Sequence, residues 1–329
     1  MKSVGKLHEF IQSQNLDSAS WYVYRQCKVA GDQNIVEQDK PDAHKSDGLL
    51  LLMPGQGATT LPKYLVYRAE AGLNSVLEEV AGSEPDFRSM SDDKAIQYQL
   101  WRIEDLNKLP ALQNQLDKMP AMYPLQNWVT PQHDVSPVDL PGEQNDGSVM
   151  SVLLFAHDQL QPLPCHRLLA DLAGMDDYGF LQRLQKSFNI RVASGPADAT
   201  PHSAREFGLY VAGYWYHLKL IEGTWFHADP VSDLDVSVVH DNMIAPMLGI
   251  TERQDKRIAY TGPDCSLAML RQQVDSGRWQ AAWLMPAPSI EDMMRISDLG
   301  RVMPAHSVCF RPLIAPAVLA TAVLTEADR

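Results

Sequence analysis

The chain has 329 residues, of which 45% are apolar and 21% are charged, a balance typical of soluble globular proteins. This length predicts two domains, and the composition excludes a disordered chain and a small disulfide scaffold. The 41 acidic residues outnumber the 28 basic residues and give a net charge of −13. Because an acidic surface repels phosphate backbones, nucleic acid is not expected as a partner.

The amino-terminal half alternates predicted helices and strands. Apolar residues at helical spacing predict helices at residues 2–14, 73–81 and 105–117. Apolar and aromatic runs predict strands at residues 21–29, 48–53, 64–67 and 96–103. Residues 129–147 are rich in Pro, Gly and polar residues, which indicates a linker.

The carboxy-terminal half continues the alternation. Strands are predicted at residues 149–156, 258–261 and 279–285, and a hairpin joins residues 207–212 to 215–221. Helices are predicted near residues 167–173, 177–188, 236–247, 266–275 and 290–299. The pattern predicts an α/β protein (α+β mixed), with mixed sheets and flanking helices. The protein is expected to have two sub-domains, an amino-terminal α/β region over residues 1–128 and a carboxy-terminal domain over 148–329.

No segment indicates secretion or membrane anchoring. Residues 1–10 lack the continuous apolar stretch of a signal peptide. The longest apolar runs, residues 49–53 and 313–324, are shorter than the roughly 20 residues that cross a bilayer. We therefore expect a cytoplasmic protein that does not bind membranes; the sequence does not indicate an oligomeric state.

Short distinctive strings occur in a fixed order along the chain. They occupy residues 100–103, 153–160, 165–168, 206–210, 234–237, 244–250, 255–258, 275–277 and 302–307. In order and spacing they resemble the uncharacterised, mainly bacterial family catalogued as domain of unknown function 1015. The resemblance covers most of the chain and identifies it as a divergent member of that family.

One string of that family is missing. Its members usually carry Asp-Gly-His-His-Arg at the start of a helix, a string similar to the phosphate-contacting motif of ParB-like and sulfiredoxin-like folds. In that motif, Gly lets the backbone approach a ligand, Arg donates two parallel hydrogen bonds to phosphate, and the helix amino terminus adds partial positive charge. The matching stretch here, residues 122–129, contains no Gly, His or Arg. The resemblance therefore implies a degenerate ParB-like amino-terminal half and a catalytically degenerate protein.

Basic residues in the matching strings are the candidate anion ligands. Lys256 and Arg257 precede a predicted strand and Gly262 follows it, and two adjacent cations beside a glycine turn can hold phosphate or carboxylate. Arg167 and Ser307 lie in other matching strings. We expect these residues to bind a small anionic metabolite or to form a docking surface for a protein partner. The alternative for the basic pair is an exposed charged loop.

The weaker catalytic candidates are His157, Asp158 and Asp235. His157 can act as a base beside a carboxylate, and Asp235 is either a helix cap or an acid that faces the site. The alternative function is a nucleotide-dependent phosphotransferase or hydrolase acting on a small metabolite. For this alternative function, a nucleotide with Mg is the cofactor. Arg167, Lys256 and Arg257 would then bind the phosphate in place of the missing phosphate-contacting motif. Otherwise no cofactor is expected, because no Walker, His-Glu-x-x-His or dinucleotide-binding string occurs.

The four cysteines occur singly, with no Cys-x-x-Cys pair and no His pair at zinc-finger spacing. We therefore expect no metal site and four reduced thiols. Cys165 and His166 are adjacent, but adjacent residues on an extended segment point to opposite faces. They are not expected to share one ligand.

Overall fold

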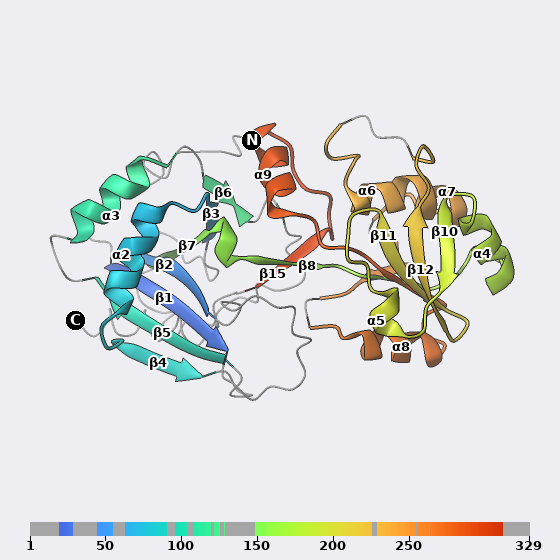
Figure 1. Ribbon diagram of the computed structural model, residues 1–329, viewed down its shortest axis with the longest axis horizontal. Helices are drawn as coiled ribbons and strands as arrows, with labels where there is room; N and C mark the ends of the chain where they lie inside the picture. Colours follow the sequence, from blue (N-terminus) through green and yellow to red (C-terminus); the bar gives the residue numbers. More distant parts are fainter. Residues whose placement is uncertain are drawn as a thin grey trace. The chain divides into compact units, whose positions relative to one another are not determined.

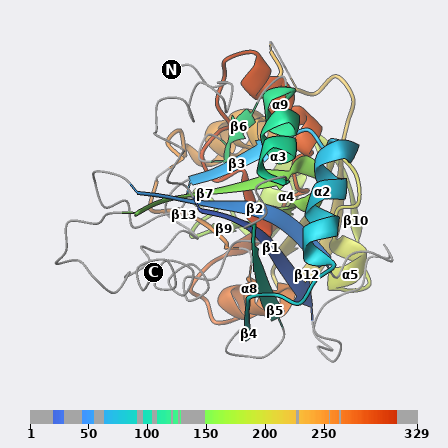
Figure 2. The ribbon, with the colours of Figure 1, turned by 90° about the vertical axis from the view of Figure 1, so that its left-hand side faces the viewer.

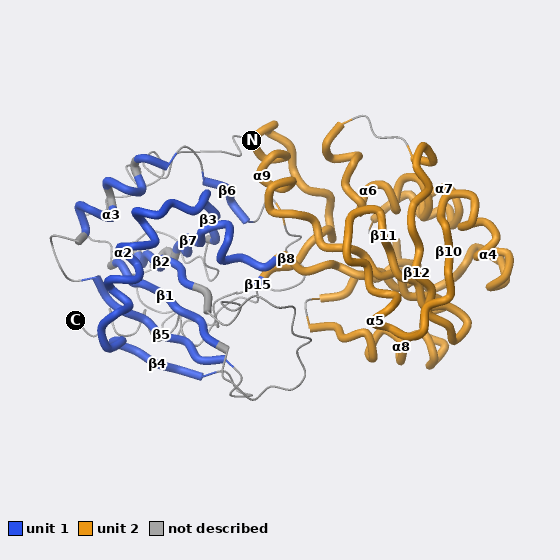
Figure 3. Tube along the Cα trace, in the orientation of Figure 1, with its two compact units in different colours: residues 1–126, 135–161, 311–329 blue, residues 127–134, 162–310 orange. Residues whose placement is uncertain are grey.

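The computed structural model describes most of the chain and divides it into two compact units (Figures 1 and 3). Unit 1 comprises residues 1–126, 135–161 and 311–329, and unit 2 comprises residues 127–134 and 162–310. The described residues are 20–28, 45–54, 63–90, 96–103, 108–119, 122–125, 128, 149–225, 229–253, 255–262 and 264–311. The predicted helix at residues 2–14 and the predicted linker at 129–147 lie outside them.

Unit 1 is built on a seven-stranded mixed sheet of order β4-β5-β1-β2-β7-β3-β6. Its strands are β1 (Ser20–Lys28), β2 (Lys45–Pro54), β3 (Lys63–Tyr67), β4 (Phe87–Met90), β5 (Ile96–Arg102), β6 (Met122–Pro124) and β7 (Val149–Ala156). Strands β3 and β7 are parallel, and the other described pairs of this sheet are antiparallel. Strand β6, within residues 122–129, is an edge strand of this sheet.

Two helices, α2 (Ala71–Ala81) and α3 (Lys108–Asp117), lie on the same face of this sheet (Figures 1 and 2). Leu73 and Leu77 of α2 and Leu112 and Leu116 of α3 are spaced by four residues, so each pair lies on one side of its helix. All four leucines are buried in one core with residues of the sheet, including Trp21. The amphipathic pattern in the sequence is thus confirmed for both helices.

Unit 2 is built on a six-stranded antiparallel sheet of order β10-β12-β11-β14-β9-β13. Its strands are β9 (Arg167–Leu169), β10 (Phe188–Val192), β11 (Glu206–Val211), β12 (Tyr214–Leu220), β13 (Ile258–Tyr260) and β14 (Ala281–Leu284). Strands β8 (Gln161–Pro164) and β15 (Val308–Arg311) pair as a separate two-stranded ribbon. Helices and sheets in both units confirm the predicted α/β class, and the unit 1 sheet is mixed, whereas the described pairs of the unit 2 sheet are all antiparallel.

Helices cover both faces of the unit 2 sheet. The helices of unit 2 are α4 (Asp177–Leu184), α5 (Pro196–Ala199), α6 (Asp235–Val239), α7 (Ala245–Leu248), α8 (Leu267–Asp275) and α9 (Ile290–Asp298). In Figure 1, α5 and α8 lie on one side of the sheet and α6 and α7 on the other. Leu168, Tyr210 and Ala282 pack in one cluster with Ala199 of α5 and Leu270 of α8, which lie below the strands in Figure 1. Because side chains alternate along a strand, the residues next to Leu168 point to the opposite face, where α6 lies.

One predicted helix is wrong. Residues 167–169, expected to begin a helix near 167–173, form strand β9 between β13 and β14. Arg and Leu are good helix formers, but all three residues are buried and hydrogen-bonded between two strands, and this tertiary context outweighs local propensity. The predicted hairpin is confirmed: β11 and β12 meet at Ala212 and Gly213, whose φ angles of 52° and 81° are typical of a type I′ turn.

Gly208 in β11 has no room for a side chain. An added Cβ would lie 2.4 Å from the carbonyl oxygen of Ala199 and 2.7 Å from Cδ1 of Leu284. We expect Gly208→Ala to lower the free energy of unfolding by roughly 2 kcal/mol, because the backbone of α5 must move. Urea unfolding followed by tryptophan fluorescence measures this change. Gly262→Ala is the control, since its Cβ meets nothing within 4 Å, and equal stability of the two variants would contradict the prediction.

Candidate functional site

Arg167 is a fully buried arginine with unbonded donors. It begins β9, has 0% exposure, and lies opposite Tyr260 of β13 and Trp283 of β14. Its Nη2 donates to the carbonyl oxygen of Val236 in α6 at 2.7 Å. Its Nε and Nη1 find no hydrogen-bond partner among the residues that the structure describes. A buried donor left unbonded costs roughly 1–3 kcal/mol, so such an arginine requires an explanation.

Three further side chains near Arg167 carry buried polar atoms that have no partner in the described part of the chain: Nη1 of Arg253, Oη of Tyr260 and Nδ1 of His240. The guanidinium carbon of Arg167 lies 5.9 Å from the centre of the Tyr260 ring. Arg253 is electrostatically coupled to Arg167, to Tyr260 and to His240. We call Arg167, His240, Arg253 and Tyr260 the arginine cluster.

The arginine cluster carries two positive charges, one on the buried Arg167 and one on Arg253, whose side chain is 16% exposed. Burial lowers the pKa of Arg167 to about 10, which leaves it protonated at neutral pH. Burial also lowers the pKa of Arg253, but a guanidinium stays charged in proteins. The carboxylate nearest to Arg253 in the described ion pairs is Asp241, at 3.9 Å, and its side chain is 56% exposed. Buried charges are normally paired, so this environment favours an anion.

His240 adds an acceptor to these donors. Its Nε2 lies 3.1 Å from the carbonyl oxygen of Thr251, which only accepts, so Nε2 carries the proton. Burial lowers the pKa of His240, and the charges of Arg253 and Arg167 lower it further, so the ring is neutral at pH 7. Nδ1 is then an acceptor, while the hydroxyl of Tyr260 can donate or accept. The cluster therefore combines several donors with one acceptor.

A π-helical turn positions His240. The turn spans His240–Ile244 and lies between α6 and α7. Pro246 in α7 has no backbone N–H, so it cannot donate to the carbonyl of Asn242 as an α-helix requires. Single π turns inside helices are frequent at functional sites. The proline thus accounts for the widened turn that begins at the histidine of the cluster.

His306 packs its ring against Tyr260 of the arginine cluster. Its ring is buried and stacks on Tyr260, with ring centres 4.1 Å apart and planes 9° apart. Its φ of 58° lies in the left-handed region, which costs energy for a residue other than glycine. The next residue, Ser307, is buried and its hydroxyl donates to the carbonyl oxygen of Pro304. The string at 302–307 therefore packs against the cluster through His306.

The predicted anion ligands Lys256, Arg257 and Gly262 do not belong to the arginine cluster. Arg257 pairs with Asp255 at 2.7 Å, and its Nη1 and Nη2 donate to the carbonyl oxygens of Leu248 and Gly249 at 3.0 and 2.9 Å. These bonds satisfy the carboxyl end of α7. Lys256 is exposed, and Gly262 is partly exposed just beyond β13. Anion binding by Lys256, Arg257, Gly262 and Ser307 stays a prediction.

Asp235 has a structural partner. It does not cap α6, whose N-cap residue is Leu234. Its carboxylate accepts from Nη1 of Arg205 at 2.7 Å and from the Arg205 backbone N–H at 3.2 Å. Burial raises the pKa of Asp235, although the Arg205 guanidinium opposes this rise. A catalytic role for Asp235 stays a prediction.

His157 and Asp158 follow β7 of unit 1, in a short 3₁₀ turn (His157–Gln159). Nδ1 of His157 accepts from the backbone N–H of Ala69 at 3.0 Å, so this nitrogen is already engaged in a structural hydrogen bond. Asp158 is exposed; burial and then its charge raise the pKa of Tyr67. Catalysis by this pair stays a prediction.

His166 makes the stability of unit 2 depend on pH. Its Nδ1 accepts from the backbone N–H of Met285 at 3.1 Å, and burial lowers its pKa to about 4. The unfolded chain takes up this proton near pH 6.5, so the stability contribution is complete above that pH and is lost as the pH falls towards 4. We expect a loss of about 3 kcal/mol over this range.

Urea unfolding of the wild type and of His166→Gln at several pH values between 7 and 4 isolates this contribution. The variant lacks the titrating ring, so the difference in stability between the two proteins should shrink as the pH falls. Parallel curves would contradict the assignment to His166.

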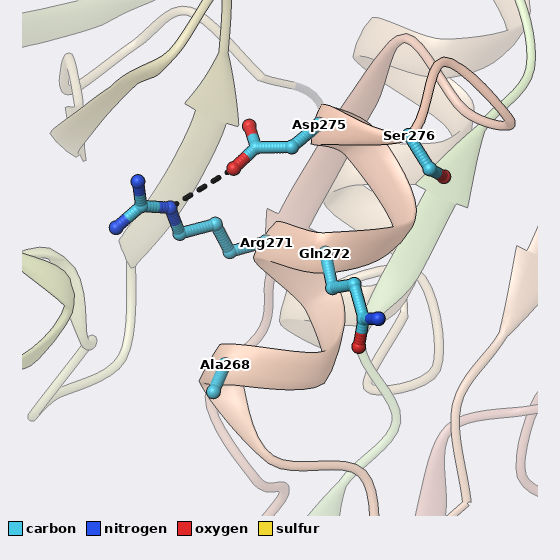
Figure 4. Close-up of a pocket in the computed structure, with 5 residues that line it drawn as sticks. All are labelled: Ala268, Arg271, Gln272, Asp275 and Ser276. Carbon is cyan, nitrogen blue, oxygen red and sulfur yellow. Dashed lines mark hydrogen bonds and ion pairs between the residues drawn. The ribbon is translucent and has the colours of Figure 1, made fainter.

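A hollow on the surface of α8 is not a comparable site. It has a volume of ≈ 440 Å³ and is lined by Ala268, Arg271, Gln272, Asp275 and Ser276 (Figure 4). Arg271 pairs with Asp275 at 3.0 Å, and the hydroxyl of Tyr210 donates to the same carboxylate at 2.6 Å. These charges compensate one another. The hollow therefore offers no unpaired charge to a ligand.

Two further features are absent from the described residues. No described helix is long and apolar enough to span a membrane. Across the described ranges, no group of three or more His, Cys, Asp or Glu side chains is placed to hold a metal ion. The arginine cluster remains the group that combines buried charge with unbonded donors.

Sequence reasoning found one member of the cluster and missed three. The string at 165–168 indicates Arg167, whereas no string in the sequence indicates His240, Arg253 or Tyr260 as a ligand. One signal was available for His240: with Asp241 it interrupts an apolar run in the helix predicted at 236–247. Arg253 and Tyr260 offered no such signal, because the fold brings them to Arg167 from a loop and a neighbouring strand.

The fold and this cluster define an α/β protein with a buried cationic site, and a family model agrees with the resemblance in the sequence. Residues 136–237, less than a third of the chain, match the family described as "Protein of unknown function (DUF1015)". The match includes Arg167 and supports membership of that family. No curated protein matches the chain.

Solved structures show only distant similarity. One is described as "Free serine kinase in complex with AMP"; it has 14% sequence identity and a TM-score of 0.30, over 79% of this chain and 90% of that chain. Another is a conserved hypothetical protein from Pyrococcus furiosus, with 10% identity and a TM-score of 0.32, over 77% of this chain and 92% of that chain. At these scores neither similarity indicates a function.

Proposed function

We propose that unit 2 binds a small oxyanion at the arginine cluster and that the protein is a catalytically degenerate, anion-binding member of its family. The observation that carries the proposal is Arg167, which has 0% exposure and two donors that no described residue satisfies. Native proteins rarely leave such groups unpaired. A ligand that has hydrogen-bond acceptors and a negative charge would bond both donors of Arg167 and compensate its charge.

An anion meets this requirement better than water. Water can accept from Nε and Nη1 of Arg167, but it leaves the charges of Arg167 and Arg253 uncompensated. An anion about 4 Å from one charge gains about 4 kcal/mol at an effective dielectric constant of 20. Two coupled guanidinium groups and one exposed carboxylate therefore support an anionic ligand.

The mixture of donors and an acceptor indicates the class of anion. Guanidinium groups bond oxyanions through paired N–H donors. Nδ1 of neutral His240 needs a proton from the ligand, which hydrogen phosphate has and which chloride and acetate lack at pH 7. We therefore propose phosphate, or a small molecule that carries a phosphate group, as the preferred ligand.

Binding is tested with inorganic phosphate, sulfate, acetate and chloride at constant ionic strength, by thermal unfolding and titration calorimetry. Phosphate is expected to raise the melting temperature saturably and more than the other anions. In Arg253→Met, affinity should fall by roughly tenfold or more, because a hydrogen bond to a charged group contributes about 1.5–3 kcal/mol.

Lys256→Met is the matched control, since it removes one positive charge of unit 2 outside the cluster. It should bind phosphate as the wild type does. If Lys256→Met abolishes binding and Arg253→Met does not, the predicted loop is the site and the cluster is not. No binding of any anion by the wild type would contradict the proposal altogether.

A further inference from the structure

Cys165 and Cys309 lie side by side although 144 positions separate them in the chain. Their sulfur atoms are 3.1 Å apart, and the two side chains are 2% and 5% exposed. Cys165 directly follows β8 and Cys309 lies in β15, and these two strands pair as a ribbon. Strand pairing therefore holds the two thiols together in the folded protein.

We propose that Cys165 and Cys309 form a disulfide when the protein meets a peroxide. A disulfide has a sulfur–sulfur bond of about 2.05 Å, so the sulfur atoms need to approach by only about 1 Å. Rotation of the two side chains can supply such a shift. This inference does not depend on the anion site.

The chemistry balances with hydrogen peroxide as the oxidant. The first thiol, as thiolate, attacks a peroxide oxygen; the S–O bond forms, the O–O bond breaks, and the departing hydroxide takes up the thiol proton as water. The second sulfur attacks the resulting sulfenic acid; the S–S bond forms, the S–O bond breaks, and hydroxide leaves with the second proton as water. Two thiols are oxidised to a disulfide, and one peroxide is reduced to two waters.

Cys165 is placed to react first. It stands two residues before Arg167 and is electrostatically coupled to that guanidinium. The thiolate is the reactive form of cysteine, and a neighbouring cation attracts it. Burial raises the pKa of Cys265, whereas the coupling to Arg167 is a property of Cys165. Cys27 belongs to unit 1.

The disulfide would constrain most of unit 2. The chain enters the main segment of this unit at Pro162 and leaves it after Phe310. The two cysteines stand close to these positions in the sequence, so the bond closes nearly the entire segment into one covalent loop. Closing so long a loop restricts the unfolded chain and stabilises the folded state.

The full-length protein is treated with hydrogen peroxide, its remaining thiols are alkylated under denaturing conditions, and its tryptic peptides are mapped by mass spectrometry. We expect an intact mass lower by two hydrogen atoms and one linked peptide pair, containing Cys165 and Cys309, that dithiothreitol separates. The melting temperature of the oxidised protein should rise by roughly 5 °C or more and return on reduction.

The other cysteines provide matched controls. Cys27→Ser and Cys265→Ser should keep the linked pair, whereas Cys165→Ser and Cys309→Ser should lose it. In Cys309→Ser, dimedone should trap a sulfenic acid at Cys165. The proposal is overturned if peroxide leaves Cys165 and Cys309 open to alkylation in the wild type, or if either of them links to Cys27 or Cys265.

Discussion

Replacing Arg205 with methionine is expected to lower the free energy of unfolding of unit 2 by about 3 kcal/mol. The guanidinium of Arg205 bonds the carboxylates of Asp233 and Asp235, and it lies 5.2 Å from the centre of the Trp225 ring. The Asp235 side chain is only 13% exposed. Without its partner, this carboxylate is a buried, uncompensated charge, and removing one partner of a buried pair is strongly destabilising.

The loss in free energy of unfolding caused by Arg205→Met should grow as the pH rises. Burial already raises the pKa of Asp235, and loss of the arginine raises it further. The folded state then binds a proton more tightly than the unfolded chain, whose Asp pKa is near 3.8. Any stability from this difference is present below that pH and is lost as the pH rises through the folded pKa. The variant should therefore be closer to the wild type at pH 4 than at pH 7.

Urea unfolding at both pH values measures this difference. Arg191→Met is the matched control: Arg191 also pairs with an aspartate, Asp198, but its side chain is 53% exposed. Exposed ion pairs contribute little, so this variant should lose much less stability. Similar losses in the two variants, or a loss from Arg205→Met that does not depend on pH, would contradict the account of Asp235.

Elements governed by local pattern could be predicted from the sequence. The helices α8 and α9 were expected at 266–275 and 290–299, and in each a serine just before the helix, Ser266 or Ser289, caps its first turn. Strand β9 could not be predicted, because residues 167–169 become a strand only between β13 and β14. That environment comes from segments far along the chain.

The arginine cluster, like strand β9, could not be predicted from local sequence. Arg253 and Arg257 stand four positions apart in one loop region, and nothing nearby in the sequence distinguishes their roles. The structure bonds Arg257 to Asp255 and to the end of α7, whereas Arg253 couples to the buried Arg167. Likewise, no local signal joins Cys165 to Cys309. Both groupings follow from contacts between segments far apart in the chain, which local periodicity does not encode.

Replacing Arg167 with methionine is expected to abolish phosphate binding while leaving stability nearly unchanged. Methionine fills much of the volume of arginine and removes two buried unbonded donors, each of which costs roughly 1–3 kcal/mol in the folded state. It also leaves the carbonyl oxygen of Val236 without its bond from Arg167, at a cost of roughly 1–3 kcal/mol. These contributions oppose each other, so we expect a net change within about 1 kcal/mol.

The two Arg→Met variants of unit 2 should therefore behave in opposite ways. Arg205→Met should unfold more easily but, while folded, respond to phosphate as the wild type does, because Arg205 bonds aspartates outside the cluster. Arg167→Met should retain its melting temperature in phosphate-free buffer and show no rise when phosphate is added. If Arg167→Met instead loses several kcal/mol and still binds phosphate, Arg167 is a structural arginine like Arg205, and the unbonded donors of the cluster have no part in binding.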